Sequence, residues 1–284
     1  MNRILIIGDH CGLSEELDAV LRRGSLALEC VGGHAEALEQ LRIQQFSVVI
    51  TSCESDVDRD LALLAEMRSI QPEVKCVVLA RSSTATEVIA SLKAHVFACY
   101  TPPFSAREIA RVVSYAANDG AWQDDIHVVS SKPDWLSVRV NCRMATAERL
   151  LTFERELSER LPEQARREMM QALREILMNA MEHGAAFNPE QTVEVMAIRT
   201  ARSLVFYVHD PGKGFRRDEL KHAAINNPPE NPAAHILERE KAGMRPGGYG
   251  LLVASGTVDE LIFSEIGNEV LLIKYLTSGD ADRA

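Results

Sequence analysis

The stretch EILMNAMEHG, residues 175–184, decides how the second half of the chain is interpreted. Read as a helix, it places Glu175, Asn179 and Glu182 on one side, because four or seven residues is close to a whole number of turns. That side would otherwise belong to a core, yet it carries two carboxylates and a carboxamide. Such a face is either exposed to water or holds a ligand, and the segments downstream decide between the two.

A second motif, DPGKGF, occupies residues 210–215 and directly follows the alternating apolar stretch SLVFYVHD, residues 203–210. A carboxylate at the end of a strand can accept a hydrogen bond from an amino group such as that of adenine. Glycine allows the backbone to approach a ligand closely. Alone the motif is weak evidence, because a D-x-G turn after a strand is common.

A third motif, RPGGYGLLVAS, occupies residues 245–255. Three glycines, at positions 247, 248 and 250, precede an apolar helix that is expected to begin near Leu251. Backbone N–H groups at a glycine-rich helix start form a ready anion site. By itself the pattern is of moderate weight, because such glycines often only permit tight packing.

Taken together and in this order, ExxxNAxEHG, DxGxGF and GGxGL resemble the Bergerat-fold (GHKL) ATPase superfamily over roughly residues 126–276. The layout is most similar to the serine-protein kinase and anti-sigma factor branch in bacteria. The resemblance implies that the polar helix face binds Mg-ATP, with ATP and Mg²⁺ as cofactors.

The resemblance also implies a role for each matched residue. Asn179 would hold Mg²⁺, an ion that prefers few protein ligands and keeps several waters. Glu175, one turn earlier, would act as the catalytic general base on an incoming hydroxyl. Asp210 would bind the adenine amino group. The remaining ATP-binding residues are glycines, two that let the loop close over base and sugar and two that offer N–H groups to the phosphates: Gly212, Gly214, Gly248 and Gly250.

The stretch 216–247 is the lid segment by resemblance, and its NNPPENP run (226–232) excludes regular helix or strand there. Its cations are either γ-phosphate contacts or ordinary solvated charges: Arg216, Arg217, Lys221, Lys241 and Arg245. Lys213 could equally contact phosphate or water. His183 is expected to stabilise the helix C-terminus before a stop at Gly184.

Two functions fit these residues. A histidine autokinase is disfavoured, because the expected helix 145–161 contains no histidine. The first remaining hypothesis is a serine/threonine kinase that uses Mg-ATP to phosphorylate a STAS-type anti-sigma-factor antagonist. The second is an ATP-gated protein that sequesters a partner such as a sigma factor with little catalysis. Glu175 favours the first, because a pure binder requires no general base.

The first 118 residues alternate short apolar runs with amphipathic stretches. The expected strands are 3–8, 26–31, 46–50, 75–80 and 95–100, and the expected helices are 13–23, 34–43, 58–70, 84–94 and 105–118. Near-continuous apolar strands belong in a parallel sheet that is covered on both faces. The alternation therefore predicts a doubly wound α/β domain with a five-stranded parallel sheet.

This half resembles the receiver domain of response regulators, most closely in ACYTPPFSAREIARVV, residues 98–113. Receivers use an acidic pair, a phosphoacceptor aspartate, a hydroxyl and a lysine, which here fall on Gly8 and Asp9, Ser52, Ala80 and Pro102. The domain is therefore predicted to be degenerate and not phosphorylated in the usual way. A shifted register that brings Glu54 or Asp56 to the site is the alternative. What remains is a protein–protein role, either docking or homodimerisation.

The composition of the chain further limits which classes of protein it could belong to. The chain has 284 residues, 46% of them hydrophobic, and a net charge of −10, with acidic residues in excess in both halves. Such a charge disfavours nucleic-acid binding, and no apolar run reaches the length of a membrane span. A cytoplasmic protein is expected, because the N-terminus lacks the pattern of a signal peptide.

The expected domains are 1–118 (degenerate receiver-like), 119–127 (linker) and 128–284 (ATPase or kinase). The third should be an α+β sandwich, with helices on one face of a mostly antiparallel sheet. Four cysteines recur every 23 residues, and small apolar core positions in βα units are favoured over a metal cluster: Cys30, Cys53, Cys76 and Cys99.

Overall fold

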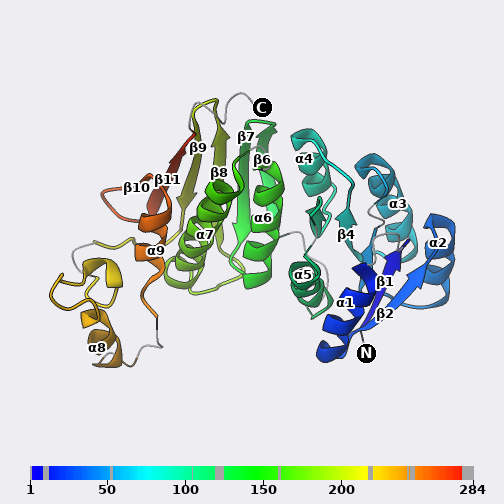
Figure 1. Ribbon diagram of the computed structural model, residues 1–284, viewed down its shortest axis with the longest axis horizontal. Coiled ribbons are helices and arrows are strands. Elements are labelled where there is room, and N and C mark those ends of the chain that lie inside the picture. Colours follow the sequence, from blue (N-terminus) through cyan, green and yellow to red (C-terminus); the bar gives the residue numbers. More distant parts are fainter. Residues whose placement is uncertain are drawn as a thin grey trace. The chain divides into compact units, whose positions relative to one another are not determined.

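The computed structural model of the chain describes residues 2–8, 13–51, 54–103, 105–118, 125–158, 161–216, 220–241, 243 and 247–276. It divides into two compact units, the first formed by residues 1–124 with 148–157 and the second by residues 125–147 with 158–284 (Figure 1). Among the helices of the described residues, none combines the length and apolar character that a bilayer crossing requires.

Strands and helices alternate through the first unit. Its elements are β1 (Arg3–Ile7), α1 (Leu13–Leu21), a 3₁₀ turn (Arg22–Gly24), β2 (Ala27–Val31), α2 (His34–Ile43), β3 (Val48–Ile50), α3 (Val57–Ile70), β4 (Lys75–Leu79), α4 (Ala85–Lys93), β5 (Ala98–Tyr100) and α5 (Ala106–Asn118). The strands pair in parallel in the order β2-β1-β3-β4-β5. This is the order of flavodoxin-like doubly wound sheets, so the predicted fold class is confirmed.

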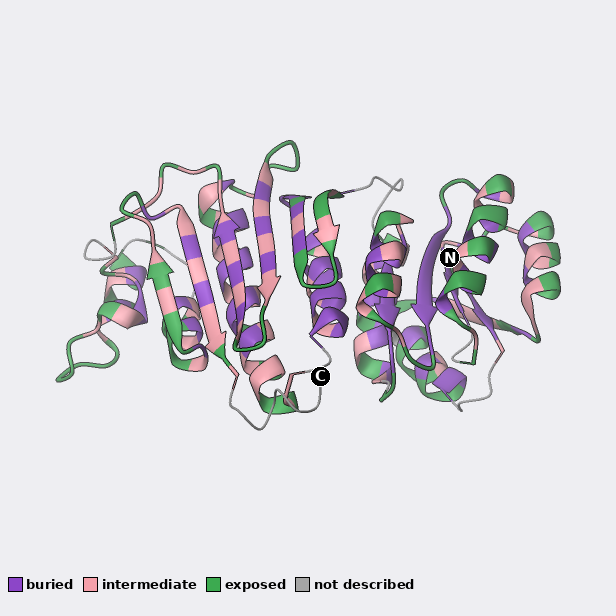
Figure 2. Ribbon diagram, turned by 90° about the horizontal axis from the view of Figure 1, so that it is seen from above, coloured by how far each residue is buried: buried purple, intermediate pink, exposed green. Residues whose placement is uncertain are grey.

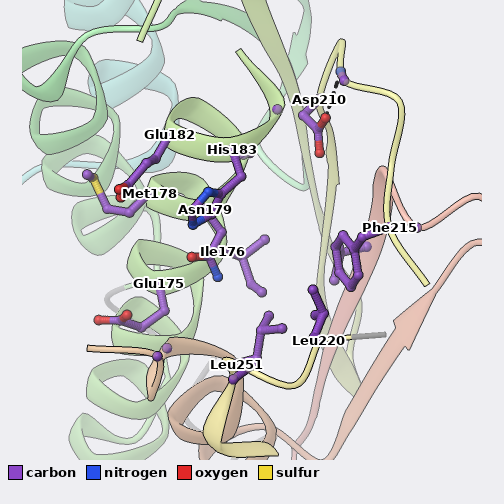
Figure 3. Close-up of a pocket in the computed structure, with 18 of the residues that line it drawn as sticks. Glu175, Ile176, Met178, Asn179, Glu182, His183, Asp210, Phe215, Leu220 and Leu251 are labelled. Carbon is purple, nitrogen blue, oxygen red and sulfur yellow. Dashed lines mark hydrogen bonds between the residues drawn. The ribbon is translucent and has the colours of Figure 1, made fainter. Parts of the chain in front are cut away.

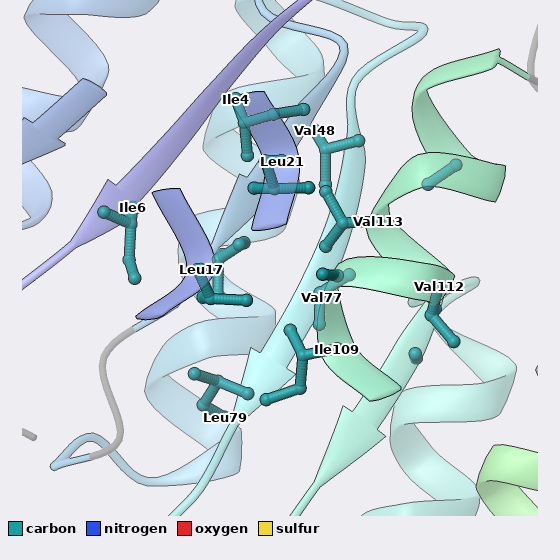
Figure 4. Packing of buried hydrophobic residues seen from close by; sticks show 14 of the residues in the cluster. Ile4, Ile6, Leu17, Leu21, Val48, Val77, Leu79, Ile109, Val112 and Val113 are labelled. Atoms are coloured by element: carbon teal, nitrogen blue, oxygen red, sulfur yellow. The ribbon is translucent and has the colours of Figure 1, made fainter. Parts of the chain in front are cut away.

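The sheet is covered on both faces because its strands are apolar throughout. All five residues of β4 are buried. On one face, α1 packs against α5 over a core drawn from strands and both helices (Figure 4). Its labelled members include Ile4, Ile6, Leu17, Leu21, Val77, Leu79, Ile109 and Val113. Each such aliphatic side chain contributes about 1.5–3 kcal/mol of transfer free energy when buried.

The last ten residues of helix α6 (Met144–Leu157) also belong to the first unit. Arg149 is buried and donates from Nε and Nη2 to the carbonyls of Phe97 and Val96, at 3.2 and 3.3 Å. Buried Glu156 accepts from the backbone N–H and the hydroxyl of Thr101, at 3.1 and 2.5 Å. Buried charges require such partners, so these contacts specify how the helix lies on this unit.

The second unit carries the remaining elements. They are β6 (Ile126–Lys132), β7 (Trp135–Asn141), the start of α6, α7 (Glu163–Asn179), a π-helical turn η2 (Ala180–Gly184), β8 (Thr192–Arg199), β9 (Ser203–His209), a 3₁₀ turn η4 (Ala224–Asn226), α8 (Ala234–Lys241), α9 (Gly250–Thr257), β10 (Glu260–Phe263) and β11 (Glu269–Tyr275). The six strands form an antiparallel sheet in the order β10-β11-β9-β8-β7-β6.

Burial alternates along the strands of this sheet, as the purple and pink bands of Figure 2 show. The buried side chains of β8 and β9 include Val193, Val195, Phe206 and Val208. Helix α7 contacts β9, β11 and α9, and it buries an apolar stripe at helical spacing, formed by Met169, Ala172, Leu173, Ile176 and Leu177. The predicted helix-on-sheet α+β architecture is confirmed. Because the apolar stripe packs inward, the polar residues of α7 lie on its other side.

Several expectations need correction. The helix expected to run to Gly184 is α-helical only to Asn179 and continues as the π-helical turn. The helix expected at 145–161 ends at Leu157. Strand β6 begins at Ile126, inside the stretch interpreted as a linker.

The cysteines divide between core and surface. Cys76 and Cys99 are buried in β4 and β5, as expected for small apolar residues. Cys30 is exposed, because it lies on the edge strand β2, which has a neighbour on one side only. Cys53 lies outside the described residues.

Candidate functional site

A cavity of about 560 Å³ lies in the second unit between α7, η2, the loop after β9 and the start of α9 (Figure 3). Every residue that the sequence predicts for an ATP site lines it: Glu175, Asn179, Asp210, Gly212, Gly214, Gly248 and Gly250. The three motifs are separated in the sequence and converge here. Cavities of this size suit a cofactor-sized ligand.

Helix α7 supplies one side of the cavity. Glu175 and Asn179 are one turn apart and half-buried, while Ile176 between them is nearly fully buried. Figure 3 shows both polar side chains on the opposite side of the cavity from Asp210 and Phe215. The apolar stripe of α7 faces the sheet, so the polar residues of the same helix are held at the cavity rather than free to rotate away.

The glycine box, residues 247–250, leads into α9 and packs directly on this polar face. A Cβ atom built on Gly250 would lie 2.7 Å from Glu175 Oε2 and 3.6 Å from Asn179 Nδ2. Gly248 has φ +92° and leaves no room for a Cβ beside the His222 carbonyl oxygen, at 2.6 Å. The box is therefore needed for close packing, and phosphate binding by its N–H groups stays a prediction.

Asp210 follows the last residue of β9 and is fixed by its own loop. The Gly212 N–H donates to Asp210 Oδ1 at 2.8 Å. The Asp210 N–H donates to the Asn268 carbonyl at 3.0 Å, and Asn268 Nδ2 donates back to the Asp210 carbonyl at 3.3 Å. Burial raises the pKa of the Asp210 carboxyl above its usual value, and the Gly212 N–H and the charge of His209 oppose that rise.

Gly184 has a role that the sequence did not reveal. It was interpreted as a helix stop, but it lies against Asp210, and a Cβ built on it would overlap the Asp210 carboxylate and lie 2.6 Å from the Asp210 Cβ. Gly212 is equally close-packed, since its built Cβ would lie 2.8 Å from the Gly184 Cα. The end of the first motif and the start of the second are thus in direct contact.

Gly214 is required by packing, whatever its expected role at a bound nucleotide. Its φ of +73° and its contact with the backbone of Ile266 leave no space for a Cβ, and Gly267, with φ +88°, packs in the same way against the Phe215 backbone. The loop after β9 is therefore seated on the turn between β10 and β11. Phe215 then meets Phe263 edge-to-face, with ring centroids 5.6 Å apart, as a further apolar part of the cavity.

A cation of the lid segment lines the cavity although the sequence did not single it out as a phosphate contact. Arg239 of α8 is buried, lines the cavity and donates from Nη1 to the His222 carbonyl at 3.3 Å. Lys241 instead pairs with Glu238 at 2.8 Å on the outside of α8. Lys213 lines the cavity and is exposed. Arg217 and Arg245 lie outside the described residues.

The two histidines of this region also line the cavity, His183 as an exposed residue of η2 and His222 as a half-buried residue of the lid segment. Burial lowers the pKa of His222, and the charges of Arg239 and His183 lower it further. His222 is therefore neutral at neutral pH. His183 was expected only to stabilise a helix end, and its place at the cavity follows from the π-helical turn, which shifts the register of the last residues of α7.

The donor set fits a magnesium ion shared with phosphates better than an ion held by protein alone. Within the described residues, no group of three or more His, Cys, Asp or Glu side chains could hold a metal. Mg²⁺ keeps several waters and needs only one or two protein ligands when substrate phosphates supply the others. The Asn179 carboxamide, at the cavity beside Gly250, suits that arrangement.

The raised pKa of Asp210 gives a pH prediction. The carboxylate must be ionised to accept a hydrogen bond from an adenine amino group, so nucleotide affinity is expected to fall as the pH drops through that raised pKa, above the ordinary value of 3.8. Titration calorimetry of the wild type and Asp210→Asn from pH 7.5 down to about pH 4, close to the ordinary pKa of the carboxyl group, tests this. The variant should bind nucleotide more weakly at pH 7.5, and its affinity should change less as the pH falls. If affinity fell equally with pH in both proteins, Asp210 would not have the proposed role.

The first unit holds a buried polar cluster near the end of β3. Asp60 is fully buried and accepts from the hydroxyls of Thr51, at 2.7 Å, and Ser55, at 2.8 Å, with His34 Nε2 at 3.8 Å. Burial raises the pKa of the Asp60 carboxyl. This carboxylate is fully hydrogen-bonded and enclosed, so it is not presented to a phosphoryl donor.

The positions compared with receiver chemistry lie partly outside the described residues, and their correspondence stays a prediction. Asp9 and Ser52 are outside it. Ala80 is buried, and Pro102 precedes Pro103 through a cis peptide bond. In the alternative register, Asp56 is exposed and accepts from the Arg59 N–H as the N-cap of α3, at 2.8 Å.

Comparison with known proteins finds similarities to each part of the chain separately. Residues 140–274 match the sequence model of the family described as "Histidine kinase-like ATPase domain". No curated protein matches the chain.

Several solved structures are similar to the N-terminal part of the chain. The receiver domain protein (CheY-like) from Methanospirillum hungatei JF-1 is 17% identical over 42% of this chain and 95% of its own, with a TM-score of 0.37. The receiver domain of the Francisella response regulator 1452 is 16% identical over 42% and 98%, with a TM-score of 0.38. The HemR receiver domain from Leptospira biflexa is 19% identical over 42% and 95%, with a TM-score of 0.37.

Proposed function

We propose that this protein binds Mg-ATP in the cavity of the second unit and transfers the γ-phosphoryl group to a serine or threonine hydroxyl of a partner protein. One observation carries the proposal: Glu175 and Asn179 face the cavity one turn apart, with the glycine box packed on them and Asp210 across from them. The match to a histidine kinase-like ATPase family supports ATP as the bound nucleotide. That the phosphoryl acceptor is a serine or threonine is our proposal.

In this proposal the base and the phosphates occupy opposite ends of the cavity. Asp210 accepts a hydrogen bond from the adenine amino group, and the ring of Phe215 packs beside the base. The N–H groups of Gly248 and Gly250 donate to phosphate oxygens, where the start of α9 adds a favourable dipole. The buried guanidinium of Arg239 balances phosphate charge, because it lines the cavity close to the glycine box.

The transfer step needs few protein groups, since phosphoryl transfer depends mainly on positioning and charge stabilisation. Asn179 would hold Mg²⁺, which neutralises charge on the phosphates when bound. Glu175 takes the proton of the incoming hydroxyl as its oxygen forms a bond to the γ-phosphorus. The bond from that phosphorus to the β–γ bridging oxygen breaks, and ADP leaves.

The partner we propose is a STAS-type anti-sigma-factor antagonist, and the alternative is sequestration of a sigma factor with little catalysis. The position of Glu175 favours the kinase, because its carboxylate lies at the glycine box, where the terminal phosphates would be, rather than on the outer surface. The first unit then has a docking or dimerisation role, with its receiver-like phosphorylation chemistry absent.

The nucleotide proposal is tested by calorimetry with purified protein, ATP and Mg²⁺. Wild type should bind, and Asn179→Ala should lower the affinity for Mg-ATP about tenfold or more while changing the affinity for ATP in EDTA by less than about threefold, because the carboxamide acts through the ion. An equal loss under both conditions would show that Asn179 does not hold the metal. Absence of binding by wild type would overturn the proposed function.

Kinase and sequestering functions are separated by mixing the protein with a candidate antagonist and γ-labelled ATP. Label in the antagonist supports the kinase. Tight, ATP-dependent complex formation without transfer supports the sequestering protein.

The first unit is tested by incubating the full chain with acetyl phosphate and Mg²⁺. The mass of residues 1–118 should show no stable gain, because this part is predicted not to be phosphorylated in the usual way.

A further inference from the structure

His235 is the second residue of α8 and is fully buried, which is unusual for a histidine in a polar segment with prolines and asparagines. Its surroundings are specific. Asn227 Oδ1 accepts from the His235 backbone N–H at 2.9 Å, and Asn227 Nδ2 lies 2.7 Å from His235 Nδ1. Asn227 Nδ2 also donates to the Pro232 carbonyl.

These contacts fix the tautomer of the imidazole. Because the Asn227 oxygen is used by a backbone N–H, its amide nitrogen is the donor on the other side, toward both the Pro232 carbonyl and His235 Nδ1. Nδ1 therefore accepts a hydrogen bond and carries no proton. In the neutral ring the proton must then be on Nε2.

The Nε2–H group has no hydrogen-bond acceptor among the described residues, although the atom is buried. A buried donor left without a partner is destabilising, so such a group calls for an acceptor that the described residues do not supply. Asn227 sets up this donor by occupying Nδ1. The lid segment therefore maintains a buried, pre-oriented N–H group.

The Cδ2 side of the buried ring packs against the glycine box, just behind the cavity wall. Cδ2, which is bonded to Nε2, would be 3.1 Å from a Cβ built on Gly248. The Tyr249 ring stands perpendicular to the imidazole, with centroids 4.5 Å apart. Arg239 Nη1 would be 3.2 Å from the same Gly248 Cβ. Gly248, Tyr249 and Arg239 all line the cavity, so His235 and the Arg239 cation adjoin one point of its boundary.

We propose that His235 Nε2–H donates to an oxygen of the β- or γ-phosphate of the bound nucleotide, beside Arg239. The inference rests on the proposed function and names a further binding residue for it. A phosphate oxygen there accepts the hydrogen bond of His235 Nε2–H, and the nearby charge of Arg239 attracts the same anion. Gly248 is then required to be glycine because a side chain would stand between the imidazole and the ligand.

The test compares the affinities of ATP, ADP and AMP for wild type, His235→Phe and His235→Gln, with folding checked by circular dichroism. Phenylalanine keeps a planar ring and removes the donor, so it should weaken binding of the nucleotide that carries the contacted phosphate by about ten- to a hundredfold. AMP affinity should change by less than about threefold. Glutamine, which can place an amide N–H near the Nε2 position, should recover part of the loss.

Each other result decides against the inference. Equal losses for ATP, ADP and AMP would show that His235 only packs the lid segment, and unchanged affinities in His235→Phe would show that no phosphate contacts it. Both outcomes leave the proposed function intact, because wild type still binds ATP. If wild type itself binds no nucleotide, the proposed function fails, and the inference fails with it.

Discussion

Replacing Gly184 by alanine is expected to reduce the affinity for adenine nucleotides by at least about a hundredfold. The added methyl group would overlap the Asp210 carboxylate, whose Cβ would be only 2.6 Å away, so either Asp210 or the end of η2 must move. Gly212 packs against both Gly184 and the Asp210 carboxylate, so neither can move apart from the other without displacing Gly212. Loss of one well-placed buried carboxylate hydrogen bond, together with displacement of the loop, accounts for the size of the effect.

The measurement is calorimetry or fluorescence titration with Mg-ATP, supported by a thermal melt. Gly256→Ala is the matched control, because Gly256 lies in α9 and a Cβ built there meets nothing within 4 Å. The control should bind normally and gain slightly in stability, since alanine favours a helix over glycine. Normal ATP affinity in a folded Gly184→Ala protein would show that the contact with Asp210 does not position the adenine site.

Replacing Glu175 by glutamine is expected to lower phosphoryl transfer to the antagonist by about 10²–10⁴-fold, the range for loss of a general base. ATP affinity should stay within about threefold of wild type, because glutamine has nearly the same size beside Gly250 and the adenine contacts are remote. The change is read as single-turnover transfer of label from ATP at saturating nucleotide.

Glu163→Gln serves as the control on the same helix, because Glu163 is exposed at the start of α7 and pairs with Arg167, at 3.1 Å, away from the cavity lining. Its transfer rate should equal that of wild type. Full activity of Glu175→Gln would remove Glu175 as the base. A combined loss of transfer and ATP affinity would instead mean that the carboxylate holds the glycine box in place.

Much of the architecture follows from local patterns. The alternation of apolar runs and amphipathic helices in residues 1–118 gives the doubly wound sheet, with strand ends displaced by only one to three residues. The period-two pattern of β8 and β9 gives half-exposed antiparallel strands. Both predictions succeed because side-chain period is a property of neighbouring residues and survives packing.

The composition of the candidate site was also accessible from the sequence, because its residues occur in short motifs with fixed spacing. The structure brings Glu175, Asn179 and Asp210 to one cavity with the glycines of the other two motifs. Their individual chemical roles stay predictions until nucleotide binding and transfer are measured.

Contacts between distant segments were not accessible in the same way. Gly184 looked like a helix stop, since only the fold brings Asp210, 26 positions later, against it. In the sequence, Arg239 looks like the other Lys and Arg residues of the lid segment and was overlooked. It is buried because α8 packs on the glycine box, which only the fold shows. The last ten residues of α6 belong with the first unit through Arg149 and Glu156, which no local pattern could signal.

The sequence by itself determined the two fold classes, the order of elements and the motif residues of the cavity, because these depend on periodicity and on motifs read within a few residues. Only the tertiary structure decided why particular glycines are required and which histidine carries an unsatisfied N–H. Those properties depend on steric exclusion and hydrogen-bond satisfaction between segments tens of residues apart, and neither has a signature in the order of amino acids along one segment.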